Sequence, residues 1–155
     1  IFSKFVNKIK KRKDLSIALL LMKKDKKSGI VSGIGNYLMA EILYEAKISP
    51  FRTVGSLTKK EIETLYHAIQ HITKLSYYNN TTGYMTHFND FIEIHKKRID
   101  QNMYPNYHSH IKLKKNDKFE FNVYKRKIDP FGNEVIVDKT IQKTRSTYWV
   151  RKIQK

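Results

Sequence analysis

The residues best suited to chemistry in this sequence form one short stretch, Val31-Ser32-Gly33-Ile34-Gly35-Asn36-Tyr37. Glycines at positions 33 and 35 bracket one apolar residue, so the backbone there can adopt positive φ and approach a partner closely. A helical pattern begins directly after Asn36, and a helix N-terminus presents unpaired N–H groups and the positive end of the helix dipole. The stretch predicts an anion site that fits a phosphate. The alternative is a glycine turn that only connects two helices.

The charge balance favours a polyanionic partner. Lys and Arg number 31 against 14 Asp and Glu, which gives a formal net charge of +17. A solvated basic surface is the alternative, but so large an excess in a short chain indicates a polyanion, and nucleic acid fits best. Lys23, Lys24, Lys26 and Lys27 fall beside the glycine turn, where they suit the negative end of the preceding helix.

Several other classes of site are disfavoured. The sequence contains no cysteine, which removes disulfides and thiolate zinc sites. His67 and His71 are four residues apart, but no third ligand stands at a suitable spacing, so we expect no metal and no cofactor. The apolar run Leu15–Met22 is too short to span a bilayer, and no signal peptide is evident. We expect an intracellular monomer with no membrane partner.

The elements that must position the turn are helical over most of the chain. Asp14 can cap a first helix, and Pro50 ends a second one. A capping box at Thr58–Glu61 predicts a third, and residues 88–99 predict a fourth, followed by a loop at 101–117. The sequence thus predicts a helical domain at 1–118 with a two-helix motif at 14–50. The apolar stripes that carry these helices are Leu15, Ala18, Leu19 and Met22; Leu38, Ile42, Leu43 and Ala46; and Ile62, Leu65, Tyr66, Ile69, Ile72 and Leu75.

From position 119 the pattern changes to strands. Apolar and polar residues alternate over 119–123, residues 130–133 indicate a turn, and two β runs follow at 135–137 and 144–150. The last two runs predict a hairpin whose connection, 138–143, is polar and basic, with Arg145 beside its tip. The fold class is therefore mainly α with a small β domain at 119–155.

Two of these stretches together resemble the carboxy-terminal half of the formamidopyrimidine-DNA glycosylase and endonuclease VIII family. Gly33-Ile34-Gly35-Asn36-Tyr37, with Ala40-Glu41-Ile42-Leu43 and Ile48-Ser49-Pro50, is similar to the family's helix-two-turn-helix. The segments Val123–Arg126 and Arg145–Tyr148 are similar to its terminal zinc-finger hairpin. Two motifs in the right order are more specific than either alone.

The sequence departs from that family where zinc ligands usually stand. Val150 and Ile153 occupy the places of the last cysteine pair, and Phe131 occupies the place of the first upstream cysteine. Apolar packing can replace metal coordination, as in the "zincless finger" branches of the family. The resemblance therefore implies that zinc is absent. It leaves the segment 82–117 unexplained.

The resemblance also implies DNA contacts and a place in base-excision repair. Asn36 and the backbone from Gly33 through Gly35 would contact phosphates near a lesion, and Arg145 would contact those flanking an everted nucleotide. Lys26, Lys27 and Lys143 are secondary candidates for contacts with the duplex. Glu41 would support the turn.

The family is a bifunctional DNA glycosylase and lyase that attacks damaged or abasic DNA with an amino-terminal proline amine. The first proline here is Pro50, so we expect these residues to bind DNA but not to cut it, with the catalytic domain absent. The alternative is a non-catalytic protein that binds structured RNA or DNA through the same glycine turn. The hairpin with Arg145, Val150 and Ile153 argues against that alternative, since an RNA-binding module has no need of it.

Overall fold

The structure is a computed structural model that describes residues 2–24, 29, 31, 33–78 and 119–155. Contacts group residues 1–72 with 121–155 into one compact unit and residues 73–120 into another. Most of the second unit lies outside the described residues, including the helix expected at 88–99 and the loop at 101–117. The division at 118/119 stays a prediction.

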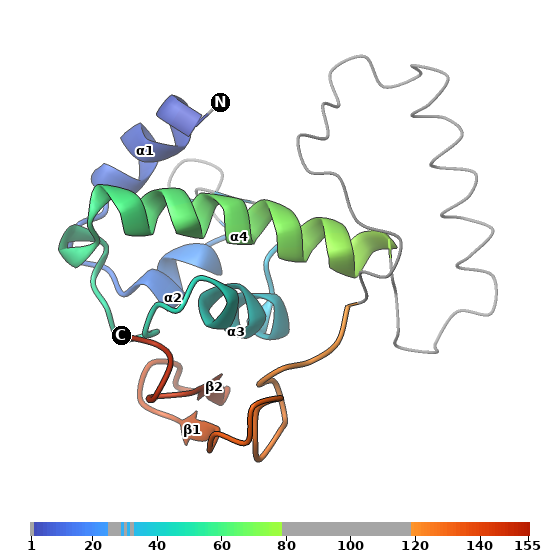
Figure 1. The fold of residues 1–155 in the computed structure, drawn as a ribbon. Helices are drawn as coiled ribbons and strands as arrows, with labels where there is room; N and C mark the ends of the chain where they lie inside the picture. Colours follow the sequence, from blue (N-terminus) through green and yellow to red (C-terminus); the bar gives the residue numbers. More distant parts are fainter. Residues whose placement is uncertain (1, 25–28, 30, 32, 79–118) are drawn as a thin grey trace. The chain divides into compact units, whose positions relative to one another are not determined.

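The described part is mostly helical, with a single two-stranded sheet (Figure 1). This arrangement confirms the predicted fold class. None of the described helices is long and apolar enough to cross a membrane. The elements in chain order are α1 (Phe2–Lys10), α2 (Ile17–Leu21), α3 (Asn36–Glu45), the 3₁₀ turn η1 (Val54–Ser56), α4 (Lys59–Tyr78), β1 (Ile136–Asp138) and β2 (Thr147–Trp149).

Helix α2 begins later than the sequence predicts. Its N-cap is Ser16, whose hydroxyl accepts a hydrogen bond from the Leu19 amide at 3.2 Å, so the prediction that Asp14 caps it is wrong. The apolar face is shifted as well, because Leu19 is 40% exposed while Leu20 and Leu21 are buried. A helix of five residues makes little more than one turn, so its buried positions need not follow a long-range stripe.

Helix α4 confirms both of its sequence features. The Thr58 amide donates to Glu61 Oε2 at 2.7 Å, and the Glu61 amide donates to Thr58 Oγ1 at 3.2 Å, which is the reciprocal capping box. The predicted stripe is buried except at Tyr66. That ring is half-buried and contacts Phe2 and Phe5 of α1, with ring centroids 5.1 Å away in each case.

Helix α3 is the centre of the unit. Every residue from Leu38 to Tyr44 is buried, as expected of a helix covered on all sides, and α3 packs against both α2 and β2 (Figure 1). Its end is a Schellman turn, since Ile48 N–H donates to Leu43 C=O and Lys47 N–H donates to Tyr44 C=O. Lys47 takes the left-handed position, with φ of 59°.

The predicted hairpin is confirmed. Strands β1 and β2 are antiparallel, and Val137 pairs with Tyr148 at the centre of the register. The strand expected at 119–123 is wrong, because residues 119–121 have no regular structure and the bends at Asn122 and Val123 lead into a turn at 124–125. Phe119 and Val123 are buried as the alternation predicts. However, the backbone N–H groups of residues 122–124 donate to a buried carboxylate of α3 and not to a neighbouring strand.

Candidate nucleic-acid interface

The glycine turn lies where the chain enters α3. Gly33 has φ of +82°, as expected for a glycine that the turn requires. Gly35 is the N-cap of α3 and is extended, with φ of −93°, so the expectation of positive φ fails at this second glycine. No side chain caps the helix at Gly35, which leaves the first turn of α3 suited to an outside acceptor. A Cβ added at either glycine would meet no atom within 4 Å.

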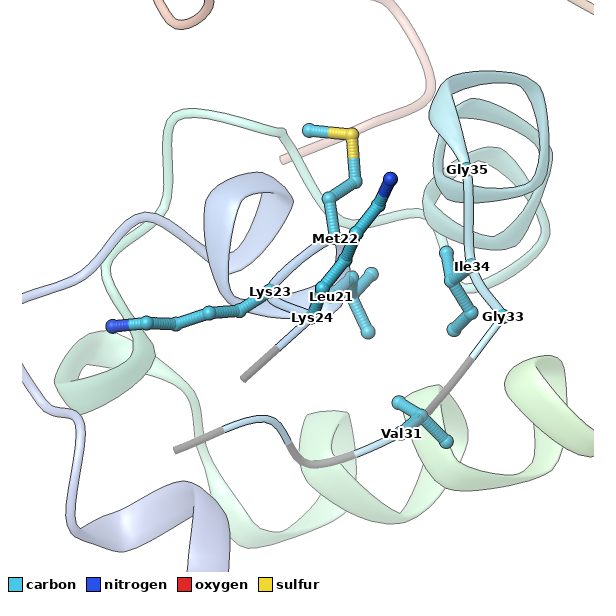
Figure 2. A pocket seen from close by; sticks show the side chains of 8 residues that line it. All are labelled: Leu21, Met22, Lys23, Lys24, Val31, Gly33, Ile34 and Gly35. Carbon is cyan, nitrogen blue, oxygen red and sulfur yellow. The ribbon is translucent and has the colours of Figure 1, made fainter. Parts of the chain in front are cut away.

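A pocket of about 340 Å³ lies against this turn. Its walls come from the end of α2 and from the glycine turn itself, and Figure 2 shows the two lysines of the α2 end extending in different directions. Lys23 and Lys24 line the same pocket as Gly33 and Gly35, which confirms that these two lysines lie close to the turn. The lining residues are Leu21, Met22, Lys23, Lys24, Val31, Gly33, Ile34 and Gly35. Lys26 and Lys27 lie outside the described residues.

The Asn36 side chain joins the start of α3 to the hairpin. Asn36 Nδ2 donates to the Ser146 carbonyl at 2.8 Å, and Asn36 Oδ1 accepts from Gln142 Nε2 at 2.7 Å. Gln142 Nε2 also donates to Thr147 Oγ1 at 3.0 Å. The two predicted motifs, far apart in sequence, therefore meet at Asn36. Gln142 was not identified from the sequence, because nothing in a polar loop marks one residue as the partner of a distant helix.

Arg145 directly precedes Ser146, so its backbone lies beside the N-terminus of α3. We call residues 139–146, which connect the two strands, the hairpin tip. Arg145 and Lys143 are exposed there, and among the described residues Arg145 makes no ion pair or hydrogen bond. Asp138 holds the start of the tip by accepting from the amides of Thr140 and Ile141, both at 2.9 Å. The side chains of Lys143 and Arg145 are thus exposed on a loop whose start is fixed by hydrogen bonds to Asp138.

The opposite end of the hairpin is apolar and buried. Val123, Val135 and Val150 pack with Ala40 and Tyr44 of α3, and we call these three valines the hairpin base. Tyr148 and Ile153 pack against the same cluster. Val150 has no exposed surface. The expectation that apolar packing holds the finger is confirmed for Val150 and Ile153.

Phe131 does not share in this packing. Its side chain is 80% exposed, so the third apolar replacement at a cysteine position contributes nothing to the hairpin base. The turn that carries Phe131 is held by Asp129 instead, which accepts from the Phe131 amide at 3.0 Å and from the Asn133 amide at 2.7 Å. Among the described residues no group of three His, Cys, Asp or Glu could hold a metal.

Glu41 has a role different from the one that the resemblance implied. Its side chain is fully buried on α3, and the carboxylate accepts from the amides of Asn122, Val123 and Tyr124 at 2.9–3.0 Å. Burial raises the pKa of Glu41 above its ordinary value, and these hydrogen bonds offset part of the rise. Glu41 therefore anchors the segment leading to the hairpin, with no hydrogen bond to the glycine turn.

Two more polar contacts fix the hairpin base to α3. The Tyr44 hydroxyl donates to Asp129 Oδ2 at 2.9 Å. Burial and the nearby Asp129 carboxylate raise the pKa of Tyr44, so the hydroxyl keeps its proton. The buried Gln154 accepts from the Val150 amide at 2.7 Å and donates to the Ile48 carbonyl at 3.0 Å. The chain's last residues are therefore pinned to the end of α3.

An aromatic cluster covers the side of α3 next to the interface. The Tyr37 ring, which is 38% exposed, contacts Phe121 and Tyr124 with centroids 5.7 and 6.1 Å apart. Tyr124 in turn contacts Tyr148 of β2 at 5.3 Å. Edge-on rings at these distances attract one another. The cluster gives α3 and the hairpin a common aromatic flank, which the sequence analysis did not identify.

His67 and His71, which the sequence disfavours as a metal site, differ in exposure. His67 is exposed, and His71 is half-buried with its Nδ1 3.1 Å from Glu45 Oε1. The contact with Glu45 of α3 explains the burial of His71. Helix α4 is thereby tied to α3 at one further point.

Comparison with known proteins identifies the family. The family model described as "Formamidopyrimidine-DNA glycosylase H2TH domain" matches residues 2–86, and the one described as "Formamidopyrimidine-DNA glycosylase C-terminal domain" matches residues 109–155. A formamidopyrimidine-DNA glycosylase of Prochlorococcus marinus is 29% identical over 97% of this chain and 44% of its own length. An endonuclease 8 of Pectobacterium carotovorum is 42% identical over 34% of this chain and 19% of its own length.

Solved structures share the fold. The formamidopyrimidine-DNA glycosylase of Lactococcus lactis, determined with DNA containing an AP site, has a TM-score of 0.58 at 18% identity and is covered over 46% of its length. The Thermus thermophilus protein gives 0.59 at 21% identity and 50% coverage. Each of these two structures matches 99% or more of this chain. The chain itself spans less than half the length of the two relatives from Prochlorococcus and Pectobacterium. With the helix-two-turn-helix and the finger hairpin both in place, this chain belongs to the formamidopyrimidine-DNA glycosylase family.

Proposed function

We propose that this chain is the DNA-binding part of a bifunctional DNA glycosylase and AP lyase of base-excision repair. Its partner is double-stranded DNA with a damaged base or an abasic site, held through backbone phosphates. The observation that carries the proposal is the hydrogen bond from Asn36 Nδ2 to the Ser146 carbonyl. It joins the N-terminus of α3 to the hairpin tip, which supports the proposal that the two elements bind phosphates on one surface.

The contacts divide between those two elements. Gly33, Gly35 and Asn36, with Lys23 and Lys24 nearby, form one phosphate-binding element. Arg145 and Lys143 of the hairpin tip form the other. Lys26 and Lys27 are proposed as additional contacts. Phosphate contacts of this kind position a duplex and carry no sequence information directly, which suits an enzyme that must search all DNA for damage.

The chemistry is proposed to come from residues outside this chain. The family resemblance assigns the attack on the sugar to a proline amine in an amino-terminal domain, and no proline here precedes Pro50. Residues 1–155 should therefore bind abasic-site DNA without forming a Schiff base. Borohydride should trap no covalent complex above the background of random lysines. Efficient trapping at one residue would overturn this division of labour.

Binding itself is tested with Asn36→Ala. Loss of one contact to a charged phosphate should weaken binding by about tenfold, and by similar factors for abasic and intact duplexes, because the contact carries no base identity. The matched control is Asn7→Ala, the same change at an exposed position of α1, which should leave affinity unchanged. Preference for structured RNA over duplex DNA, or an unchanged affinity in Asn36→Ala, would contradict the proposal.

A further inference from the structure

Gln142 lies between the two proposed DNA-binding elements. Its Nε2 donates to Asn36 Oδ1 at 2.7 Å and to the hydroxyl of the fully buried Thr147 at 3.0 Å. Gln142 and Asn36 are separated by 106 positions in the sequence. Gln142 and its neighbour Ile141 are half-buried, whereas the other residues from 139 to 145 are exposed. Gln142 is thus part of a continuous set of hydrogen bonds centred on Asn36.

The chain of hydrogen bonds fixes which way the Asn36 amide points. A primary amide has two N–H donors on one end and only acceptor lone pairs on the other. Asn36 Nδ2 faces the Ser146 carbonyl, which can only accept. If the Asn36 amide were reversed, its oxygen would face that carbonyl oxygen and its nitrogen would face Gln142 Nε2. The contact with the Ser146 carbonyl would become repulsive, and so would the contact with Gln142 unless Gln142 reversed its own amide as well. The two contacts together therefore favour the observed orientation of Asn36.

This orientation matters for an anionic partner. With one N–H of Asn36 Nδ2 on the Ser146 carbonyl and Oδ1 on Gln142, the second N–H of Nδ2 is the remaining donor of the side chain. A half-buried Asn36 can direct that donor outward. In the reversed orientation the acceptor atom Oδ1 would occupy the place of Nδ2, beside the Ser146 carbonyl. A phosphate oxygen approaching that place would then meet Oδ1 and not an N–H donor. A phosphate needs donors, so only one of the two orientations suits it.

We propose that Gln142 is a positioning residue for DNA binding: it holds the Asn36 amide with a donor toward a phosphate and ties the Arg145-bearing tip to the same point. The inference rests on the proposed function, since it explains the orientation of Asn36, one of the proposed phosphate contacts. Gln142 itself need not touch DNA. Its effect on affinity should therefore pass through Asn36, which makes the two residues energetically coupled.

The test is a double-mutant cycle on the chain with an abasic-site duplex. Gln142→Leu should weaken binding by up to about tenfold, the amount expected for a lost hydrogen bond to a charged group. Adding Gln142→Leu to Asn36→Ala should weaken binding no further, since coupled residues are not additive. Thr144→Ala, a change at an exposed neighbour in the tip, is the matched control and should leave affinity unchanged.

A second variant guards against simple loss of folding. Gln142→Glu keeps the size of the side chain but can only accept, so it should draw Asn36 Nδ2 toward itself and reverse the amide. It should bind more weakly than Thr144→Glu, which adds the same charge nearby. Equal affinities for these two variants, or additive effects in the cycle, would overturn the inference. If Asn36→Ala itself leaves affinity unchanged, the proposed function fails together with the role of Gln142.

Discussion

The two ends of the hairpin contact α3 in different ways. At the hairpin base the contacts are buried: Val150 and Glu41 have no exposed surface, and the Glu41 carboxylate is surrounded by backbone amides. At the hairpin tip the contact is a half-buried chain of side-chain amides with exposed cations beside it. The base has the composition of a protein core, whereas the tip has the composition of a nucleic-acid interface.

Because the two ends differ in this way, stability and the proposed DNA binding should be separable within one hairpin. Buried apolar area and satisfied buried hydrogen bonds determine whether the finger folds. Exposed cations add little to folding but much to the attraction of phosphates. Changes at the base should therefore lower the free energy of unfolding, and changes at the tip should lower affinity without unfolding the protein. Matched changes at the base and at the tip test that separation.

Val150→Asp should be the most destabilising change. It places a carboxylate in a fully buried apolar cluster with no partner, at a cost of about 5 kcal/mol unless the group takes up a proton. Val137→Asp makes the same change on β1 at a side chain that is 48% exposed, and it should cost less than about 1 kcal/mol. Thermal or urea unfolding measures both. Equal losses would show that the base is not a core.

Glu41→Ala should be the next most damaging. It removes the acceptor for the amides of residues 122–124. Leaving these N–H donors without a partner should lower the free energy of unfolding by about 3 kcal/mol in total. Glu45→Ala, one turn later on α3 with a side chain 42% exposed, is the control. It should cost no more than about 1 kcal/mol, as for the loss of one exposed side-chain contact. Similar costs for both variants would refute the anchoring role of Glu41.

Asp129 should give the fold an acid-sensitive step. Burial tends to raise the pKa of this carboxyl, but hydrogen bonds from Asn133, Tyr44 and Phe131 outweigh it and hold the pKa below its ordinary value. A depressed pKa in the folded state means that the stabilisation is complete above the unfolded value, about 3.9, and is lost as pH falls through the folded one. Unfolding measured from pH 7 to pH 2 should show a shallower acid decline in Asp129→Asn. An identical loss of stability with falling pH in Asp129→Asn and in the unaltered chain would show that Asp129 is not the source of the acid sensitivity.

Metal removal should have the smallest effect. The base is held by Val150, Ile153 and their neighbours, where a structural zinc would otherwise be required for folding. Chelator should leave the melting temperature unchanged, and metal analysis should find less than one zinc per chain. Stoichiometric zinc, or a melting temperature that falls with chelator, would contradict packing as the basis of the finger.

The local features of the fold were predictable from sequence because neighbouring residues determine them. The capping box of α4, the stripe on its buried face and the turn at Gly33 all follow from residues a few positions apart. The N-cap of α2 was missed because Asp14 and Ser16 are both good caps, and only the packing of Ile17 through Leu21 decides between them. Lys47 was missed too, since a lysine gives no signal for a left-handed position.

The contacts that assemble the interface could not be read from the sequence alone. Glu41 with residues 122–124, and Asn36 with Gln142, join segments more than 80 positions apart. The alternation at 119–123 was interpreted as a strand because the pattern does not reveal that a buried carboxylate binds the amides there. The family resemblance nevertheless implied phosphate contacts for both the glycine turn and Arg145, and the hydrogen bond from the Asn36 side chain to the Ser146 carbonyl joins these two segments.

The most direct test of the account is the salt dependence of duplex binding in three proteins: the unaltered chain, Arg145→Ala and Lys127→Ala. Lys127 is an exposed cation at the base end, where its carbonyl accepts from the Val135 amide at 2.9 Å. For the unaltered chain, affinity for an abasic duplex should fall about a hundredfold or more between 50 and 200 mM salt if four or more phosphates are neutralised. Arg145→Ala should reduce the slope of log affinity against log salt by about one, with an unchanged melting temperature. Lys127→Ala should leave the slope unchanged. A salt-independent affinity, or equal slopes for Arg145→Ala and the unaltered chain, would contradict DNA binding through the hairpin tip.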